Sequence, residues 1–441
     1  MCGLLPKRCI MPKYNNEFDD QYVSQSIELL DSEDNVWPKL SDEAINKVTL
    51  VGDIVNTFTD DSEVDPAAIL FTLLSGFGAA VGTGPHLKIG ETRHPARINA
   101  VLVGSSSRAR KGTSEHPIRR LLELAHDEAK LPMLNITSGA LSSGEGLIYA
   151  VRDAAIDDDN KDIGVLDKRL WSIEAEFANV LRVSKREGNT LSTIIRNAWD
   201  GGVISPLTKN NIIRATDPHI SILGHITQEE LSRVLNFVET WNGFANRFLW
   251  ICVQRKKKIP LPMPVNQTIL SVLSKSLGDS LCLAKRLKQI SLAPEALEYW
   301  SFIYNYISRD MPGRLGVITS RAEAHTLRLS IAYALLDGKD MIWLPHLEAA
   351  QAAWQYSEAS TRFLFAQSEH DPDTDKILQA LFSTPMSTTE IHELFSRHKK
   401  AAELSVLLRK LQMTNKIIAE TVGGGQGKGK GTTIWRMVEN I

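Results

Sequence analysis

The chain has 441 residues, of which 43% are hydrophobic and 23% charged, and its formal net charge is −2. This composition is that of an ordinary soluble globular protein, and the length predicts two to four domains of roughly 100–200 residues each. The four cysteines form no CxxC pair and no cluster with histidines. Their pattern excludes a disulfide framework and a zinc site, and it predicts reduced thiols in the cytoplasm.

Charge is spread unevenly along the chain, although the total is close to zero. Residues 1–65 carry fourteen acidic and five basic residues, whereas residues 397–436 carry nine Lys or Arg and two Glu. We interpret 1–65 as an acidic N-terminal arm that is partly helical. The basic C-terminal segment predicts a module that binds a polyanion, for which nucleic acid is the default partner.

An uncharged stretch, PAAILFTLLSGFGAAVGTGP, covers residues 66–85 and is about as long as a membrane span. Asp65 and Pro66 form a typical helix start, with an N-cap carboxylate followed by proline at the first helical position. Glycines interrupt the second half of the stretch. We therefore predict a buried helix, and we expect no membrane among the partners.

A strand at Asn99–Val103 leads into GSSSRARKGTS at 104–114, which is close to the phosphate-loop pattern of glycine, four residues, Gly-Lys and Ser or Thr. Arg110 stands where that pattern has glycine, and Gly104 lies one residue early. A nucleotide site and a basic surface turn both remain open on this stretch alone. In a nucleotide site the residues around the phosphates would be Gly104, Arg110, Lys111, Gly112, Thr113 and Ser114, with Thr113 also a magnesium ligand.

Two acidic side chains follow the next apolar strand, Arg169–Ile173, in the string Glu174-Ala175-Glu176. Two residues apart in extended backbone, Glu174 and Glu176 would share a face. Beside a phosphate loop, Glu174 could bind magnesium and Glu176 could activate the attacking water. An exposed acidic turn is the alternative, and on the string alone it is favoured. The position at a strand end after the loop favours the site.

The strand His219–Gly224 is followed by His225 and Thr227, which could sense the γ-phosphate or merely cap the strand. An α/β plan with a parallel sheet explains all these segments, because the carboxyl ends of parallel strands meet at one edge. The connecting elements are predicted as helices at 115–130, 144–155, 177–199 and 228–240, a loop at 157–162 and a hairpin at 203–215.

Three further basic features have a structural and a functional interpretation. Lys209 at the tip of the hairpin could contact DNA phosphates or simply face solvent. Arg247, in NGFANRFLW, could be an arginine finger for a neighbouring subunit or a partly buried arginine at the start of a strand. The run Arg255–Lys258 is better explained as a solvated strand end.

The C-terminal 70 residues predict three helices and a β-hairpin with a glycine-rich tip, which is the pattern of a winged helix. Ser387 and Glu390 predict a capping box at the second helix. A winged helix can also bind protein, so both partners remain open. The cations that could contact DNA phosphates are Lys399, Lys400, Arg409, Lys410, Lys428 and Lys430.

Several long strings resemble the YfjI-like or helicase-primase-associated P-loop proteins of phages, plasmids and genomic islands. They are LSSGEGLIYAVRD, IEAEFANVLRV, LSTIIRNAWDGG, HISILGHITQEEL and NGFANRFLWICV, and the resemblance covers roughly residues 66–365. It implies that RKGTS is the phosphate loop, that Arg110 is a family variant, and that the E-x-E string belongs to the magnesium site. It therefore favours ATP binding.

A weaker resemblance connects the chain with ring helicases of the minichromosome-maintenance type. The string NRF is similar to the arginine-finger string of that class, and SRAEAHTLRLSIAYALLDG at 320–338 is similar to its helical lid. The resemblance implies that Arg321 is a second sensor arginine. The chain departs from that class in its phosphate loop and in having Glu-Ala-Glu for the usual Asp-Glu pair.

Together these features predict a RecA/AAA-like α/β P-loop ATPase core at 66–260, a helical lid at 261–367 and a winged helix at 371–441. We expect a magnesium-dependent, DNA-dependent ATPase, either a helicase or a replication-initiation motor of a mobile element. Its partners would be single-stranded DNA or an origin duplex, and copies of itself in a filament or a ring, for example a hexamer. The alternative is a winged-helix DNA-binding regulator whose nucleotide site is a switch or is inactive.

Overall fold

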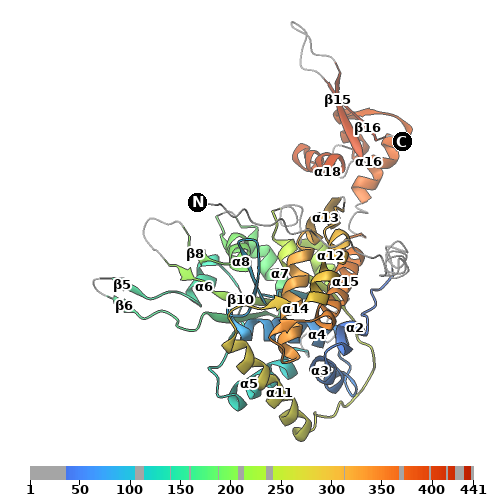
Figure 1. Cartoon of the computed structure of the whole chain (residues 1–441). Coiled ribbons are helices and arrows are strands. Elements are labelled where there is room, and N and C mark those ends of the chain that lie inside the picture. Colours follow the sequence, from blue (N-terminus) through green and yellow to red (C-terminus); the bar gives the residue numbers. More distant parts are fainter. Residues whose placement is uncertain are drawn as a thin grey trace, which may run out of the picture.

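A five-stranded parallel sheet forms the centre of the protein (Figure 1). In this computed structural model the described residues are 36–104, 114–139, 141–157, 160–186, 188–206, 213–234, 242–311, 313–366, 372–396, 399–413, 416–422 and 432–438. The strand order across the sheet is β11-β3-β10-β7-β4. The strand bounds are β3 (Ala100–Gly104), β4 (Asn135–Thr137), β7 (Arg169–Glu174), β10 (His219–Thr227) and β11 (Leu249–Val253). The predicted α/β architecture with a parallel sheet is confirmed.

Side chains of β3 alternate between two hydrophobic clusters, one on each face of the sheet. Ala100 and Leu102 belong to the larger cluster, and Val101 and Val103 belong to the second. This period of two is what a strand buried on both faces requires. β3 is therefore sandwiched between helical layers, and the loop that follows it emerges at an edge of the sheet.

Each face of the sheet is covered by its own set of helices, as Figure 1 shows for α5 and α11 on one side and α7 and α8 on the other. The first layer contains α4 (Pro66–Val81), α5 (Glu115–Glu128), α11 (Gln267–Arg286) and α14 (Ala322–Leu336). The second contains α6 (Gly144–Tyr149), α7 (Phe177–Ser184), α8 (Leu191–Asp200) and α9 (Gln228–Val234). The long α15 (Leu344–Ala366) packs against β11 and contributes to both clusters.

Helix α4 is the buried helix predicted from the uncharged stretch. The Asp65 carboxylate accepts a hydrogen bond from the Ala67 N–H at 3.0 Å, and all residues from Ala67 to Val81 are buried. Gly78 allows the helix to approach the chain before β3, because a Cβ at this position would lie 2.4 Å from the Ala96 carbonyl oxygen. No helix in the described ranges is both long and apolar enough to cross a membrane.

Two connections differ from the sequence-based expectation. The helix predicted at 144–155 ends at Tyr149, and a hairpin of β5 (Ala155–Asp157) and β6 (Asn160–Asp162) replaces the end of that helix and the expected loop. The helix predicted at 177–199 is two helices, α7 and α8. Gly188 lies between them with φ of +77°, a conformation that a continuing helix cannot contain.

The segment predicted as a helical lid packs into the same core as the sheet. Besides α11, α14 and α15 it holds α12 (Pro294–Ile307), α13 (Gly313–Thr319) and the two-residue strands β12 (Ser291–Leu292) and β13 (Met341–Ile342). The first layer also takes in α2 (Glu43–Asn46) and α3 (Thr49–Thr59), which lie inside the predicted acidic arm. One hydrophobic cluster thus contains residues of the predicted acidic arm, ATPase core and helical lid, which the sequence analysis treated as separate segments.

The C-terminal residues form a small unit with its own hydrophobic cluster, drawn in red in Figure 1. Its helices are α16 (Pro372–Ser383), α17 (Thr388–Leu394) and α18 (Ala401–Met413). Its sheet has the order β14 (Met386–Ser387), β16 (Thr432–Met437), β15 (Ile417–Val422). The predicted capping box is confirmed, since Glu390 N–H donates to Ser387 Oγ and Ser387 N–H donates to Glu390 Oε2.

Candidate nucleotide-binding site

The predicted phosphate loop follows β3, an inner strand of the sheet between β11 and β10, whose last residue is Gly104. Arg110, Lys111, Gly112 and Thr113 lie outside the described residues. Strand register sets Gly104 beside Thr227 of β10 on one side and beside Val253 of β11 on the other. Ser114, which precedes α5, is buried with its Oγ 3.4 Å from Thr72 Oγ of α4. Both ends of the loop are therefore anchored in the core.

The chain leaves β3 and β10 toward opposite faces of the sheet. After β3 it passes to the first layer through α5, whereas after β10 it passes to the second layer through α9. Adjacent parallel strands with connections on opposite faces leave a crevice at their carboxyl ends, which is where ligands bind in open α/β sheets. The carboxyl end of β3, Gly104, thus lies at a topological switch point.

Glu174 is the last residue of β7 and is buried, with 3% of its surface exposed. It accepts hydrogen bonds from the Leu141 N–H at 3.2 Å and from Ser172 Oγ at 3.3 Å. Burial raises the pKa of its carboxyl group to about 7, and these two hydrogen bonds oppose that effect. A buried carboxylate beside a phosphate loop is a suitable magnesium ligand, because a cation would compensate the cost of desolvating its charge.

Glu176 does not share a face with Glu174, contrary to the expectation for extended backbone. The strand ends at Glu174, and the chain turns before α7, so Glu176 is exposed at the start of that helix. Its carboxylate accepts a hydrogen bond from Asn179 Nδ2 at 2.9 Å. The two glutamates are therefore in different environments, and the buried one is the better candidate for the metal.

The polar residues at the end of β10 also differ from each other. His225 is buried, with 4% exposure, and pairs in register with Leu102 of β3. Thr227 is half-buried and caps α9: its hydroxyl donates to Glu230 Oε2 at 2.9 Å and accepts from the Glu230 N–H at 3.1 Å. This reciprocal cap occupies the Thr227 hydroxyl, which favours the strand-cap interpretation for this residue.

Arg247 lies at the opposite edge of the sheet, because it precedes β11 and the strands are parallel. It is buried, with 7% exposure. One terminal nitrogen, Nη2, donates to Asp200 Oδ2 at 2.8 Å, and Nη1 donates to the Gly243 carbonyl at 2.7 Å. In the single chain this arginine therefore has internal partners, and the finger role stays a prediction that requires it to exchange them.

A cluster of arginines surrounds Trp199 at this amino edge, and sequence reasoning did not foresee it. The guanidinium carbons of Arg328, Arg321 and Arg247 lie 3.5, 5.6 and 5.7 Å from the centre of the Trp199 ring. Arg97 joins them through a hydrogen bond to the Trp199 carbonyl at 3.4 Å. The one signal in the sequence is Arg328 itself, a charged residue within the apolar helix string LRLSIAYALL.

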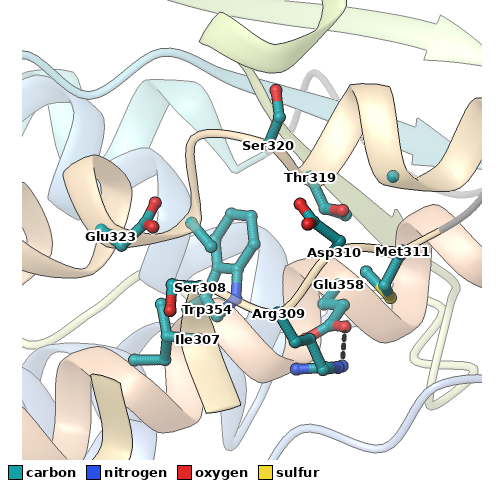
Figure 2. A pocket seen from close by; sticks show the side chains of 12 residues that line it. Ile307, Ser308, Arg309, Asp310, Met311, Thr319, Ser320, Glu323, Trp354 and Glu358 are labelled. Carbon is teal, nitrogen blue, oxygen red and sulfur yellow. Dashed lines mark hydrogen bonds and ion pairs between the residues drawn. The ribbon is translucent and has the colours of Figure 1, made fainter. Parts of the chain in front are cut away.

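A pocket of about 180 Å³ lies among α12, α13 and α15 (Figure 2). Figure 2 shows Arg309 joined to Glu358 beside Trp354. Glu358 is buried, and burial raises the pKa of its carboxyl group while Arg309 opposes the effect. Because this ion pair connects two residues that line the pocket, we interpret the pocket as a packing gap between helices and not as part of the nucleotide site.

The predicted DNA contacts are only partly within the described residues. Lys400 and Arg409 are exposed at the start and on the surface of α18, whereas Lys399 Nζ lies 2.5 Å from Asp373 Oδ2. The side chain of Lys410, and all of Lys209, Lys428 and Lys430, lie outside what the structure describes.

Comparison of the sequence with models of protein families finds no match, and comparison with curated proteins finds none either.

Proposed function

We propose that this protein is a DNA-dependent ATPase of the RecA/AAA-like P-loop class. The observation that supports it best is that the predicted phosphate loop follows β3, an inner strand of a parallel sheet, at the switch point between β3 and β10. A buried carboxylate, Glu174, lies at the carboxyl end of a strand in the same sheet. We propose further that the protein acts as a helicase or replication-initiation motor of a mobile element, as its resemblance to such proteins implies.

In this proposal Lys111 contacts the β- and γ-phosphates of ATP, and Thr113 and Glu174 hold Mg²⁺. Bound Mg²⁺ would neutralise charge on the phosphates. Glu174 is ionised when the metal is present, because the cation lowers the pKa that burial raises. Glu176, which is exposed at the start of α7 and accepts a hydrogen bond from Asn179 through one oxygen, would orient water as a general base.

DNA would be bound by the C-terminal module, which the proposal treats as a winged helix, and by the hairpin that carries Lys209. The support is the basic composition of the module and the exposure of Lys400 and Arg409 on it. Nucleic-acid phosphates are the natural partners of such cations.

A homo-oligomer would complete the site. Arg247 and Arg321 lie at the amino edge of the sheet, so the length of β3, five residues, separates them from their own phosphate loop. Five residues of strand span about 17 Å, which is too far for an arginine side chain to bridge. If these residues act in hydrolysis, they act on the nucleotide of a neighbouring copy.

Steady-state ATPase assays of the wild type and of Lys111→Ala, with and without single-stranded DNA, test the proposal. We expect turnover that DNA stimulates in the wild type and none in the variant, with unchanged thermal unfolding. Lys275→Ala, which removes an exposed lysine of α11, is the matched control and should behave as wild type. Normal turnover in Lys111→Ala would sink the nucleotide site. Binding of ATP without turnover in the wild type would favour the DNA-binding regulator instead.

A further inference from the structure

A pocket of about 570 Å³ lies at the amino edge of the sheet, opposite the predicted phosphate loop. Its walls are β2 (Thr92–Pro95), the Gly201–Gly202 backbone that follows α8, and the base of the hairpin formed by β8 (Val203–Ile204) and β9 (Ala215–Thr216). Two arginines, Arg93 and Arg97, line it. Segments far apart in the sequence thus build one pocket.

Arg97 is held rigidly in the wall of this pocket and is only 2% exposed. Its terminal nitrogens donate to the carbonyls of Trp199 and Pro218, at 3.4 and 3.1 Å. Its buried Nε–H finds no acceptor among the described residues. Gly201 leaves room for this guanidinium: its φ is +100°, and a Cβ there would lie 2.6 Å from Arg97 Nη1.

The lining of the pocket carries two arginines, Arg93 and Arg97, and three carboxylates, those of Glu91, Asp200 and Asp217. Glu91 is paired with Lys88 at 3.0 Å, outside the lining. Arg93 and Arg97 share one carboxylate, Asp217, at 3.9 and 3.7 Å. Asp200 is within ion-pair distance of only one guanidinium in the described ranges, that of Arg247.

Arg328, directly behind the pocket, donates to two carbonyl oxygens, those of Arg97 and Trp199, at 3.3 and 3.1 Å. In the described ranges it has no carboxylate within ion-pair distance. Desolvating a guanidinium is costly unless an anion compensates it. With Lys88, Arg247 and Arg328 counted beside Arg93 and Arg97, five cationic side chains lie in or next to the lining against its three carboxylates, and this surplus favours an incoming anion.

We propose that this pocket binds a phosphate-bearing anion, with Arg93 and Arg97 as its guanidinium ligands. The planar fork of arginine matches phosphate oxygens, and a phosphate carries enough charge to balance several guanidiniums. Burial lowers the pKa of Arg97 to about 10, which still leaves it charged at neutral pH. The site is separate from the predicted phosphate loop, and the proposal holds whether or not the chain hydrolyses ATP.

The anion could be a backbone phosphate of DNA or a phosphate group of a free nucleotide. The pocket lies at the base of the β8–β9 hairpin, and Arg214 beside this base is 61% exposed. Both sources offer the same chemistry to the two arginines, so the experiment must separate them.

Two single variants change the charge of the pocket in opposite directions. Arg93→Gln removes a half-exposed cation, and Asp217→Asn removes the competing carboxylate. Asp217 has φ of +49°, a conformation that asparagine tolerates, so the second variant should keep the backbone. Arg119→Gln, on α5, is the matched control, because Arg119 is also exposed and paired with a carboxylate but lies away from the pocket.

Binding is measured in the full chain carrying Lys111→Ala, so that the predicted phosphate loop contributes little. The probes are fluorescein-labelled oligothymidine by anisotropy, and ADP and inorganic pyrophosphate by calorimetry, all without Mg²⁺. We expect Arg93→Gln to raise Kd by about three- to tenfold and Asp217→Asn to lower Kd by a similar factor. Arg119→Gln should leave Kd unchanged.

The pattern across probes identifies the source of the phosphate. Opposite shifts for oligothymidine alone support a site for the DNA backbone, and opposite shifts for ADP and pyrophosphate support a site for free phosphate groups. If no probe responds to either pocket variant, or if Arg119→Gln weakens binding as much as Arg93→Gln does, the pocket is not a phosphate site. None of these binding measurements depends on hydrolysis. The result can therefore be interpreted even if the protein proves not to be an ATPase.

Discussion

At the residue scale, Glu174 links the candidate site to stability. Burial raises the pKa of its carboxyl group from 4.5 to about 7. Below pH 4.5 the group is protonated in both the folded and unfolded chains. Between pH 4.5 and 7 the unfolded chain ionises first, so the folded chain binds more protons and its stability falls as pH rises. Above pH 7 the group is ionised in both states, and the stability that its raised folded-state pKa gives at low pH is fully lost.

Glu174→Gln should remove this pH dependence, since the amide resembles the protonated acid. Relative to wild type, the free energy of unfolding of the variant should rise by about 1–3 kcal/mol between pH 4.5 and pH 8. Urea unfolding at both pH values measures it, and Glu176→Gln, which removes an exposed carboxylate, is the control. A difference that does not change with pH would contradict the buried, protonated carboxyl group.

ATP hydrolysis should also be lost in Glu174→Gln, because an amide is a poor magnesium ligand.

Individual residues were predicted well in position and poorly in environment. Glu174 ends a strand, as expected, and is buried, whereas Glu176 lies past the strand end at the start of α7 and is exposed. Arg247 precedes a strand, as expected, yet its main partner is Asp200, which is 47 residues away in the sequence. Such contacts depend on which strands lie side by side, and no local pattern contains that information.

At the scale of single elements, Thr227 and Glu230 form the N-terminal cap of α9. Thr227→Ala should lower the free energy of unfolding by about 1 kcal/mol, because it leaves helix N–H groups without an acceptor. Thr227→Ser keeps the hydroxyl and should restore most of this loss. Chemical unfolding and ATP turnover are measured together. Slow turnover with unchanged stability would show that the hydroxyl contacts nucleotide instead.

Elements with a strong local signal were predicted with nearly correct bounds. The N-cap of α4 and the capping box of α17 both follow from short motifs, and the structure contains both. The errors occur where two tendencies compete. Residues 177–199 have helical periodicity on both sides of Gly188, but α7 ends at Ser184 and α8 begins at Leu191, with the positive φ of Gly188 between them. The short hairpin of β5 and β6 is polar, so it lacks the alternation that reveals a strand.

At the scale of the whole molecule, the sequence predicted an α/β fold with a parallel sheet but not which helices pack against which elements. The run of helices after residue 260 suggested a lid, whereas α11 packs on α5 and α15 packs on β11. The hydrophobic face of a helix predicts that this face is buried, but it does not identify the element that covers it. The arginine cluster is a consequence of this packing, because α14 and its N-cap bring Arg328 and Arg321 to the ring of Trp199 on α8.

Assembly is tested by mixing two inactive variants, Lys111→Ala and Arg247→Ala. If Arg247 completes the site of a neighbouring copy, each variant alone should hydrolyse ATP poorly. The loss in Arg247→Ala should be about 10³-fold or more, the range of arginine fingers in other NTPases. A mixed oligomer contains interfaces with an intact loop on one side and an intact arginine on the other, so mixing should restore part of the activity.

Arg247 is buried and paired with Asp200, so its loss also affects stability and needs its own control. Asp200→Asn breaks the same ion pair and leaves the arginine in place, which separates the structural contribution from the catalytic one. We expect Asp200→Asn to lower the unfolding temperature while keeping at least part of the turnover, because freeing the guanidinium is the change that the finger role requires. If folded Arg247→Ala hydrolyses ATP at the wild-type rate, or if mixing with Lys111→Ala restores nothing although subunits exchange, Arg247 is a structural arginine at the start of β11.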